Sequence, residues 1–170
     1  MSLSLPASIA DAEPVRSIRT PARLDYEFTA GQATSQFLRG VKNKKLIGGG
    51  CPVCGKVYVP PRGSCAVDGV PTTEQVDVAD RGTVTTFCVV NVQFYGQGVE
   101  VPYVCATIQL DGADLGLFAM VQEMPYDQVR IGLRVEAVWV DDDELDTTLE
   151  NIKYFRPTGE PDVDVKQNIQ

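Results

Sequence analysis

The sequence predicts a mainly β protein with an N-terminal helical segment, a rubredoxin-like zinc ribbon and a five-stranded OB-fold barrel. Two observations carry this prediction. Residues 51–55 (CPVCG) and 65–69 (CAVDG) form two similar short motifs, each of which ends in glycine. Five β-rich segments separated by turn residues then follow, as expected for a small closed barrel.

The chain divides into consecutive regions. Residues 1–22, rich in Ser, Pro and Ala, predict a flexible tail. Residues 23–47 predict a helical segment, 48–72 the zinc ribbon, 73–157 the OB-fold barrel and 158–170 a C-terminal tail.

Within the helical segment, Thr34 or Ser35 is expected to cap a helix that carries Phe37 and closes near Leu46. The glycine triplet 48–50 is then expected to break the helix and act as a linker. A phosphate-binding loop is not expected there, because no Lys-Ser/Thr pair follows the glycines.

The two short motifs place four metal ligands at the spacing of a zinc ribbon: Cys51, Cys54, Cys65 and Asp68. Two ligands two residues apart can both point into one turn, and the glycine that follows can adopt positive φ where the backbone curls back. Asp68 stands where a fourth cysteine would complete a four-sulfur site. Because a carboxylate is a competent zinc ligand, we expect a structural zinc, and the oxygen ligand favours zinc over iron.

Other interpretations of the ribbon stay open. The site could be a relic that has lost its metal, because only three of the four usual cysteines are present. Cys51 and Cys54 could form a redox pair, although the extended run after Cys54 is not the helix start that such a pair needs. A catalytic zinc could exchange its oxygen ligand for water, but the sequence offers no obvious general base nearby.

The barrel strands are expected where β-branched and aromatic residues are dense, at 83–92, 103–110, 115–121, 135–140 and 149–155. A helical turn is expected near Tyr126. The acidic run 141–144 lacks the glycine and the terminal glutamate of a calcium-binding loop, so a solvated turn is expected there.

Composition limits the partners. The chain has 170 residues, 44% of them hydrophobic, and a net charge of −8, which argues against binding to nucleic acid or anionic membranes. No stretch is apolar enough to span a bilayer and no signal-peptide pattern is present, so we expect a cytoplasmic protein. Cys88 and Cys105 lie outside the ribbon in apolar runs, and we expect them to be inert core thiols rather than a disulfide.

The chain contains no histidine. This removes the commonest general base and excludes any Ser-His-Asp or Cys-His mechanism within this chain alone. No catalytic residue is therefore predicted, and an activity of the chain by itself is left open.

Several short motifs together resemble one known family. They are GVK at 40–42, CPVCG at 51–55, PPR at 60–62, Cys65 with Gly69, RGTV at 81–84, PYV at 102–104 and IGLRVE at 131–136. Their order and spacing, over about residues 37–155, resemble the bacterial and archaeal zinc-ribbon/OB-fold proteins associated with acyl-CoA thiolases. The chain departs from that family's usual four-cysteine ribbon at Asp68.

The resemblance implies a non-catalytic accessory subunit. Members of this family bind thiolase-like or lipid-transfer-protein-like enzymes. Some resemble a scaffold between a thiolase and a hydroxymethylglutaryl-CoA synthase, and others pair with aldolases that cleave steroid side chains as CoA thioesters. The resemblance therefore implies a hetero-oligomer in which this chain stabilises such an enzyme and helps to shape its acyl-CoA entrance.

Candidate contact residues lie in the barrel and in the ribbon. Phe94, Tyr95 and Tyr103 surround a glycine-containing loop of the kind that often serves as the recognition surface of an OB fold. They could contact a partner or an acyl chain, or fold back on the barrel end. Arg62 could pair with Asp68 or another carboxylate near the metal, or contact a CoA phosphate.

Two other functions are kept as alternatives. One is a free-standing OB-fold protein that binds a ligand or single-stranded nucleic acid, which the acidic composition disfavours. The other is an enzyme whose metal polarises a thioester carbonyl.

Overall fold

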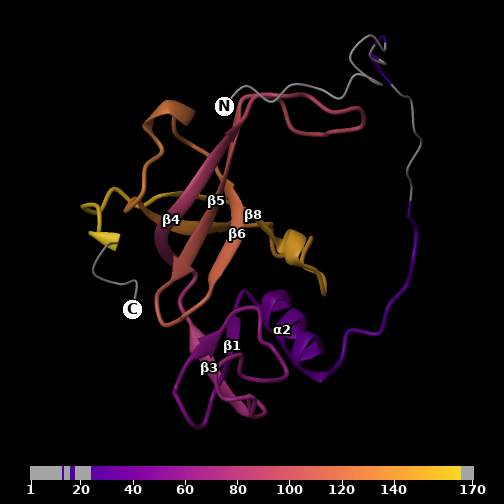
Figure 1. Cartoon of the computed structure of the whole chain (residues 1–170), viewed down its shortest axis with the longest axis vertical. Helices are drawn as coiled ribbons and strands as arrows, with labels where there is room; N and C mark the ends of the chain where they lie inside the picture. Colours follow the sequence, from indigo (N-terminus) through magenta and orange to yellow (C-terminus); the bar gives the residue numbers. More distant parts are fainter. Residues whose placement is uncertain (1–12, 14–15, 18–23, 166–170) are drawn as a thin grey trace.

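The structure, a computed structural model, describes residue 13, residues 16–17 and residues 24–165. In this part of the chain, a helix and a three-stranded sheet lie at one end and a closed five-stranded barrel lies at the other (Figure 1). This arrangement confirms the predicted fold class. Most of the predicted N-terminal tail, and residues 166–170 of the C-terminal tail, lie outside the described residues.

The helix α2 spans Gln32–Lys42 and is shorter than the sequence predicts. Gly31 occupies the N-cap position, so the prediction that Thr34 or Ser35 caps the helix is wrong. The buried residues of α2 are spaced three or four apart or adjacent, so they share one face. They are Phe37, Gly40 and Val41.

The glycine triplet is part of strand β1, Leu46–Gly50, and is not a linker. The prediction of a helix that closes near Leu46 is wrong for the same reason. A Cβ on Gly48 would lie only 2.6 Å from Cγ1 of Val57, and one on Gly49 would lie 3.1 Å from Cβ of Pro61. The strand can pass this close to the rest of the ribbon only because glycine has no side chain.

Strand β1 is the centre of an antiparallel sheet with the order β2-β1-β3. Strand β2 covers Val57–Tyr58 and β3 covers Glu74–Val78. Ile47 pairs with Asp77, which shows that β3 belongs to the sheet of the ribbon. The sequence alone assigns these residues to the barrel, because their β-rich texture runs on into the next strand.

The barrel closes in the order β4-β5-β6-β8-β7, as expected for an OB fold. Its strands are β4 (Arg81–Val90), β5 (Tyr103–Leu110), β6 (Gly116–Val121), β7 (Arg134–Trp139) and β8 (Ile152–Pro157). The helical turn expected near Tyr126 is confirmed as η1, Tyr126–Gln128. The start of the predicted last strand is instead the short helix η2, Leu149–Asn151.

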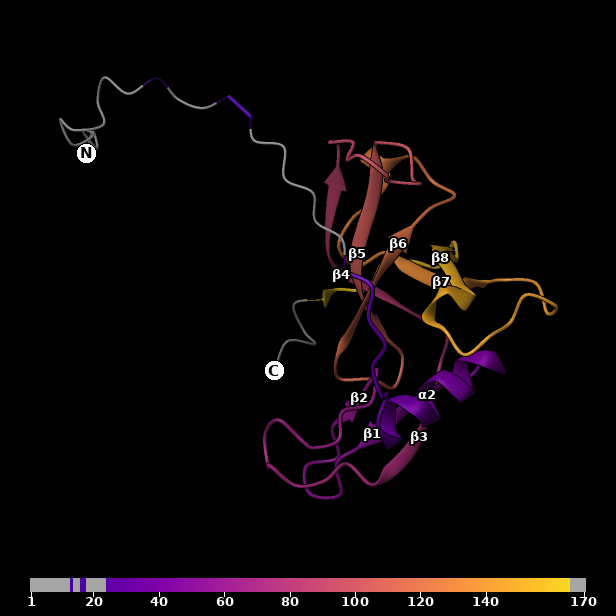
Figure 2. The same ribbon diagram turned by 90° about the vertical axis from the view of Figure 1, so that its right-hand side faces the viewer.

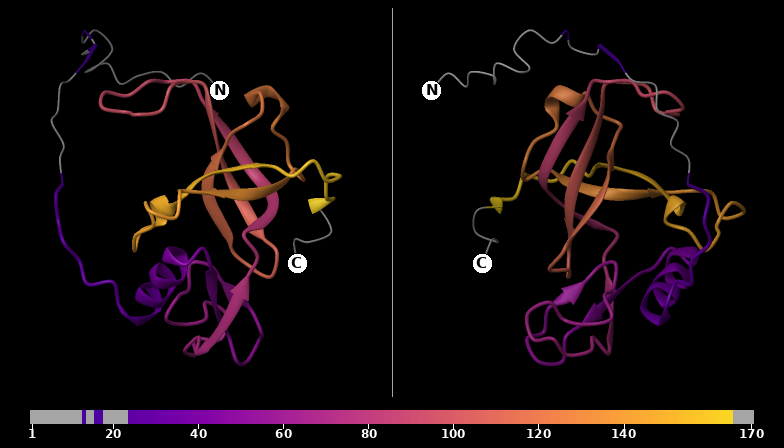
Figure 3. Two further views of the ribbon diagram at one scale, coloured as in Figure 1. Left: turned by 180° about the vertical axis from the view of Figure 1, so that it is seen from behind. Right: turned by 45° about the vertical axis from the view of Figure 1, so that its right-hand side comes forward.

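One continuous hydrophobic core joins the helix, the ribbon sheet and the barrel. Its members include Phe37, Val41, Leu46, Val59 and Val78 on one side and Val84, Ile108, Leu117, Val135 and Phe155 in the barrel. The turn between β5 and β6 adds a polar link, because Asp114 donates its amide to the Val57 carbonyl and accepts the Val57 amide with its carboxylate, both at 2.8 Å. The ribbon and barrel therefore form one packed unit (Figure 3).

The described part of the C-terminal tail, 158–165, packs against the barrel. Val163 donates its amide to the Gly132 carbonyl at 2.9 Å. Arg134, whose side chain is only 10% exposed, lies 2.6 Å from Asp111 and 3.2 Å from Glu160 of the tail. The Arg134 guanidinium holds the pKa of Asp111 below its usual range.

Cys88 and Cys105 lie directly opposite each other on β4 and β5. Their neighbour Val104 is buried in the barrel, so strand alternation places both thiols on the outer surface. Cys88 is exposed and Cys105 is half-buried, and both are free, so the prediction that Cys88 is a core residue is wrong. Burial, together with the nearby Cys88, raises the pKa of the Cys105 thiol.

Replacing Arg134 with Met should lower the free energy of unfolding by about 2 kcal/mol at pH 7, because Asp111 and Glu160 lose a nearly buried cation. Water screens part of this interaction, since Asp111 is 41% exposed. The lowered pKa of Asp111 makes its contribution fully present above about pH 4 and lost as pH falls through that pKa. The variant should therefore lose less stability on acidification than the wild type. Urea unfolding at several pH values measures both effects.

Arg156→Met is the matched control, because Arg156 is 46% exposed and pairs with Glu136 at the surface. Its cost should be clearly smaller than that of Arg134→Met, because water screens an exposed ion pair. Equal costs for the two variants would contradict a special role for Arg134.

Candidate metal centre

The two cysteine motifs fold into equivalent knuckles. In each, the closing glycine donates its amide to the carbonyl of the first cysteine at 3.0 Å, from Gly55 to Cys51 and from Gly69 to Cys65. Both glycines have positive φ, 72° and 67°, as their positions predict. The turns are thus built alike, which directs both pairs of ligands to one point.

All four predicted ligands converge. Their ligand atoms lie within 4.8 Å of one another, with Cys51 Sγ 3.2 Å from an Asp68 oxygen and Cys54 Sγ 3.6 Å from Cys65 Sγ. Zinc bound tetrahedrally at about 2.3 Å from sulfur places neighbouring sulfurs about 3.7 Å apart. The residues therefore fit one zinc ion, which would cross-link the two knuckles.

The two halves of the site differ in exposure and in protonation. Cys51 and Cys65 are buried, whereas Cys54 and Asp68 are exposed. The interaction with Asp68 raises the pKa of the Cys54 thiol to about 12. The same interaction, with a further contribution from Cys51, holds the pKa of Asp68 below its usual range. Zinc must displace the Cys54 proton to bind there, so binding should release protons.

Tyr58 contacts one of the predicted metal ligands, and the sequence alone did not predict this contact. Its hydroxyl lies 3.2 Å from Cys65 Sγ and accepts the amide of Ala66 at 3.2 Å. The hydroxyl lowers the pKa of the Cys65 thiol, and the pKa of Tyr58 is raised in return. No spacing rule links Tyr58 to Cys65, because the contact depends on how β2 lies over the second knuckle.

Arg62 makes a contact that the sequence did not predict. Its guanidinium carbon lies 5.9 Å from the centre of the Tyr58 ring, a cation–π arrangement. Among the ion pairs between described residues, none joins Arg62 to Asp68. Arg62 therefore lies over the tyrosine whose hydroxyl contacts the predicted ligand Cys65.

The aromatic loop lies at the end of the barrel farthest from the ribbon (Figure 2). Tyr95 is fully exposed and Phe94 is 64% exposed, so these two side chains do not fold back on the barrel. Tyr103, at the start of β5, is half-buried. The structure thus keeps Arg62 apart from the other three candidate contact residues.

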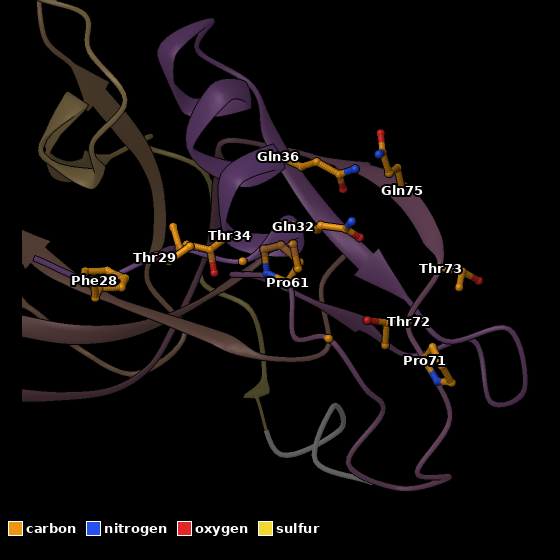
Figure 4. A pocket seen from close by; sticks show the side chains of 14 residues that line it. Phe28, Thr29, Gln32, Thr34, Gln36, Pro61, Pro71, Thr72, Thr73 and Gln75 are labelled. Carbon is orange, nitrogen blue, oxygen red and sulfur yellow. The ribbon is translucent and has the colours of Figure 1, made fainter.

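A groove of about 720 Å³ separates the segment 28–36 from the ribbon. Figure 4 shows Gln36 of α2 pointing toward Gln75 of β3 across it. Its lining contains amides, hydroxyls, prolines and Phe28, but no ionisable side chain among the described residues. It offers no general acid or base.

Comparison with known proteins identifies the family. Residues 40–74 match the model of the ChsH2 rubredoxin-like zinc ribbon domain, and residues 75–140 match that of the ChsH2 C-terminal OB-fold domain. A protein of Methanocaldococcus jannaschii, described as a DUF35 domain-containing scaffold protein, is 37% identical over 95 residues, which cover 55% of this chain and 67% of that protein. The chain belongs to the ChsH2 (DUF35) family.

Two solved structures share the ChsH2 fold. An Ltp2-ChsH2(DUF35) aldolase has a TM-score of 0.56 and 23% identity, and covers 73% of this chain and 93% of its own. A DUF35-family protein of unknown function from Sulfolobus solfataricus has a TM-score of 0.55 and 22% identity, with coverages of 75% and 84%. At this identity the two structures support the fold alone. Within the described residues, no helix is long and apolar enough to cross a membrane.

Substitutions of Asp68 should tune metal binding in opposite directions. Asp68→Ala removes one ligand and should weaken zinc binding at least ~10-fold, whereas Asp68→Cys restores four sulfurs and should tighten it. Competition with a chromogenic chelator measures both affinities. Unchanged affinity in Asp68→Ala would show that the carboxylate is not a ligand.

Tyr58→Phe should weaken zinc binding about 10-fold, because it removes the hydroxyl that contacts Cys65 while keeping the ring under Arg62. The same chelator competition measures this loss. Arg62→Met serves as the control, since it leaves the hydroxyl in place and should change the affinity much less.

Proposed function

We propose that this chain is a non-catalytic accessory subunit that binds and stabilises a thiolase-like enzyme acting on acyl-CoA thioesters, and helps to shape its substrate entrance. The observation that carries the proposal is the pairing of a zinc-stapled ribbon with a barrel whose aromatic loop is exposed at its far end. Exposed aromatic residues are enriched where proteins bind one another.

The names of the relatives support the same role. One structural relative is an Ltp2-ChsH2(DUF35) aldolase, and the relative from M. jannaschii is described as a scaffold protein. The absence of histidine from the chain and the lack of ionisable residues in the described groove are consistent with chemistry that takes place in the partner.

The loop has a defined shape that suits a binding role. The Gln97 side chain accepts the amide of Phe94 at 3.1 Å and donates to the carbonyl of Val99 at 3.0 Å. These bonds hold the loop without using its aromatic side chains. Phe94 and Tyr95 can therefore enter a partner's pocket at a small entropic cost.

The test is co-expression with a tagged thiolase-like enzyme encoded by the same genome. The two chains should co-purify and elute together from a gel-filtration column. A chain that elutes as a monomer with every such enzyme would overturn the proposal.

Within the complex, Tyr95→Ala should raise the dissociation constant about 10- to 30-fold, as truncation of an aromatic hot spot commonly does. Isothermal titration calorimetry measures the change. Tyr126→Ala removes another exposed tyrosine, 48% exposed and outside the loop, and should leave the affinity unchanged.

A further inference from the structure

The barrel has two unlike outer sides. On β7 and β8, Arg156 lies 2.9 Å from Glu136 and 3.9 Å from Glu123, so this side carries paired charges. Arg81, at the start of β4, is charged and pairs with Asp111 and Glu160. Farther along the strands, the outward positions within 86–90 of β4, 103–107 of β5 and 118–120 of β6 hold no charged residue. They are Thr86, Cys88, Val90, Tyr103, Cys105, Thr107, Phe118 and Met120, and we call them the uncharged face.

Strand register assembles these residues into one surface. Thr86, Thr107 and Phe118 form one row across the three strands, and Cys88, Cys105 and Met120 form the next. The alternate residues of β5, Ala106 between the rows and Val104 beside the second row, are buried inside the barrel. The uncharged face is therefore set by the register of three strands and does not depend on a loop.

The composition of this face is unusual for a surface exposed to water. Antiparallel strands normally place apolar residues inside and polar or charged residues outside. Here Phe118 is 68% exposed and Cys88 is also exposed, and the half-buried Met120 and Cys105 lie between them. A contiguous, partly exposed apolar surface of this kind can mark a site where another molecule binds.

We propose that the uncharged face binds an uncharged, apolar surface of the partner enzyme, with Phe118 as its central anchor. This inference rests on the proposed function and adds the surface through which the enzyme is held. The lack of charge on this face limits which molecules can bind it. A nucleic acid or an anionic membrane would meet no cation here, and a charged protein surface would be desolvated without a counter-charge.

The uncharged face is too small to form a complete interface by itself. Three strands about 4.8 Å apart, with about 3.4 Å per residue over five residues, cover roughly 250 Å². Each partner contributes about 800 Å² to a standard interface. The loop between β4 and β5 leaves directly from this face and adds the exposed Val92, Phe94 and Tyr95. Face and loop together form a continuous surface that is larger than the face alone.

Cys88 is a free, exposed thiol on the uncharged face, so its reactivity can report whether a partner covers that face. In the zinc-loaded chain alone, N-ethylmaleimide should alkylate Cys88, and in the complex the rate should fall at least tenfold. Peptide mass spectrometry separates Cys88 from the ribbon cysteines, and Cys88→Ser confirms the assignment by removing the signal.

Substitution of Phe118 provides the second measurement. Phe118→Asp should raise the dissociation constant at least 30-fold, whereas Phe118→Leu should change it by less than about fivefold. Ile131→Asp places the same charge at another exposed apolar position, 56% exposed and outside the face, and should bind like the wild type. Thermal unfolding shows whether each variant is folded, and Cys88 protection in the wild type does not depend on that outcome.

The results separate this inference from the proposed function. If a complex forms but Cys88 reacts at the rate of the free chain, or folded Phe118→Asp binds normally, the uncharged face is not the interface while the accessory role stands. If the wild-type chain forms no complex, both proposals fail. Protection of Cys88 with selective loss in Phe118→Asp supports both.

Discussion

The convergence of four ligands from two equivalent knuckles is the constraint on which the ribbon depends. The ribbon's own buried cluster is small, with Cys51, Tyr58 and Cys65 at its centre and Val70 and Leu115 packed against it. So few apolar contacts cannot offset the entropy of ordering two long turns. A zinc ion that cross-links the knuckles supplies what this core lacks.

The ribbon also packs against the end of the barrel where β5 turns into β6. Leu115, from the turn between β5 and β6, packs on the cluster around the metal ligands, and Asp114 beside it bonds both ways to Val57. Val59 and Val78 of the ribbon belong to the same core as the barrel valines. Loss of the metal should therefore loosen the end of β5 and β6 as well as the knuckles.

Local patterns in the sequence predicted the parts that depend on local chemistry. The four ligands and the barrel strands follow from spacing and alternation, which act over a few residues. The sequence missed what depends on the meeting of distant surfaces. Glycines 48–50 seemed a linker because nothing local shows that Val57 passes within 2.6 Å of a Cβ there. Cys88 seemed a core residue because an apolar run does not show which of its faces points outward.

Closure of the barrel explains why its outer surface can serve recognition. Every barrel strand pairs with two neighbours, although β4 pairs with β7 only over 81–83 and β6 pairs with β8 only at Val121. Closure leaves little strand edge for a partner to extend, so recognition by side chains, on a loop or on an outer face, is favoured. Arg156 of β8 is held between Glu136 of β7 and Glu123, and these paired charges leave little for a partner to gain. The uncharged face on β4, β5 and β6 has no charges to pair, and Phe118 is the residue of that face whose burial by another protein would gain most.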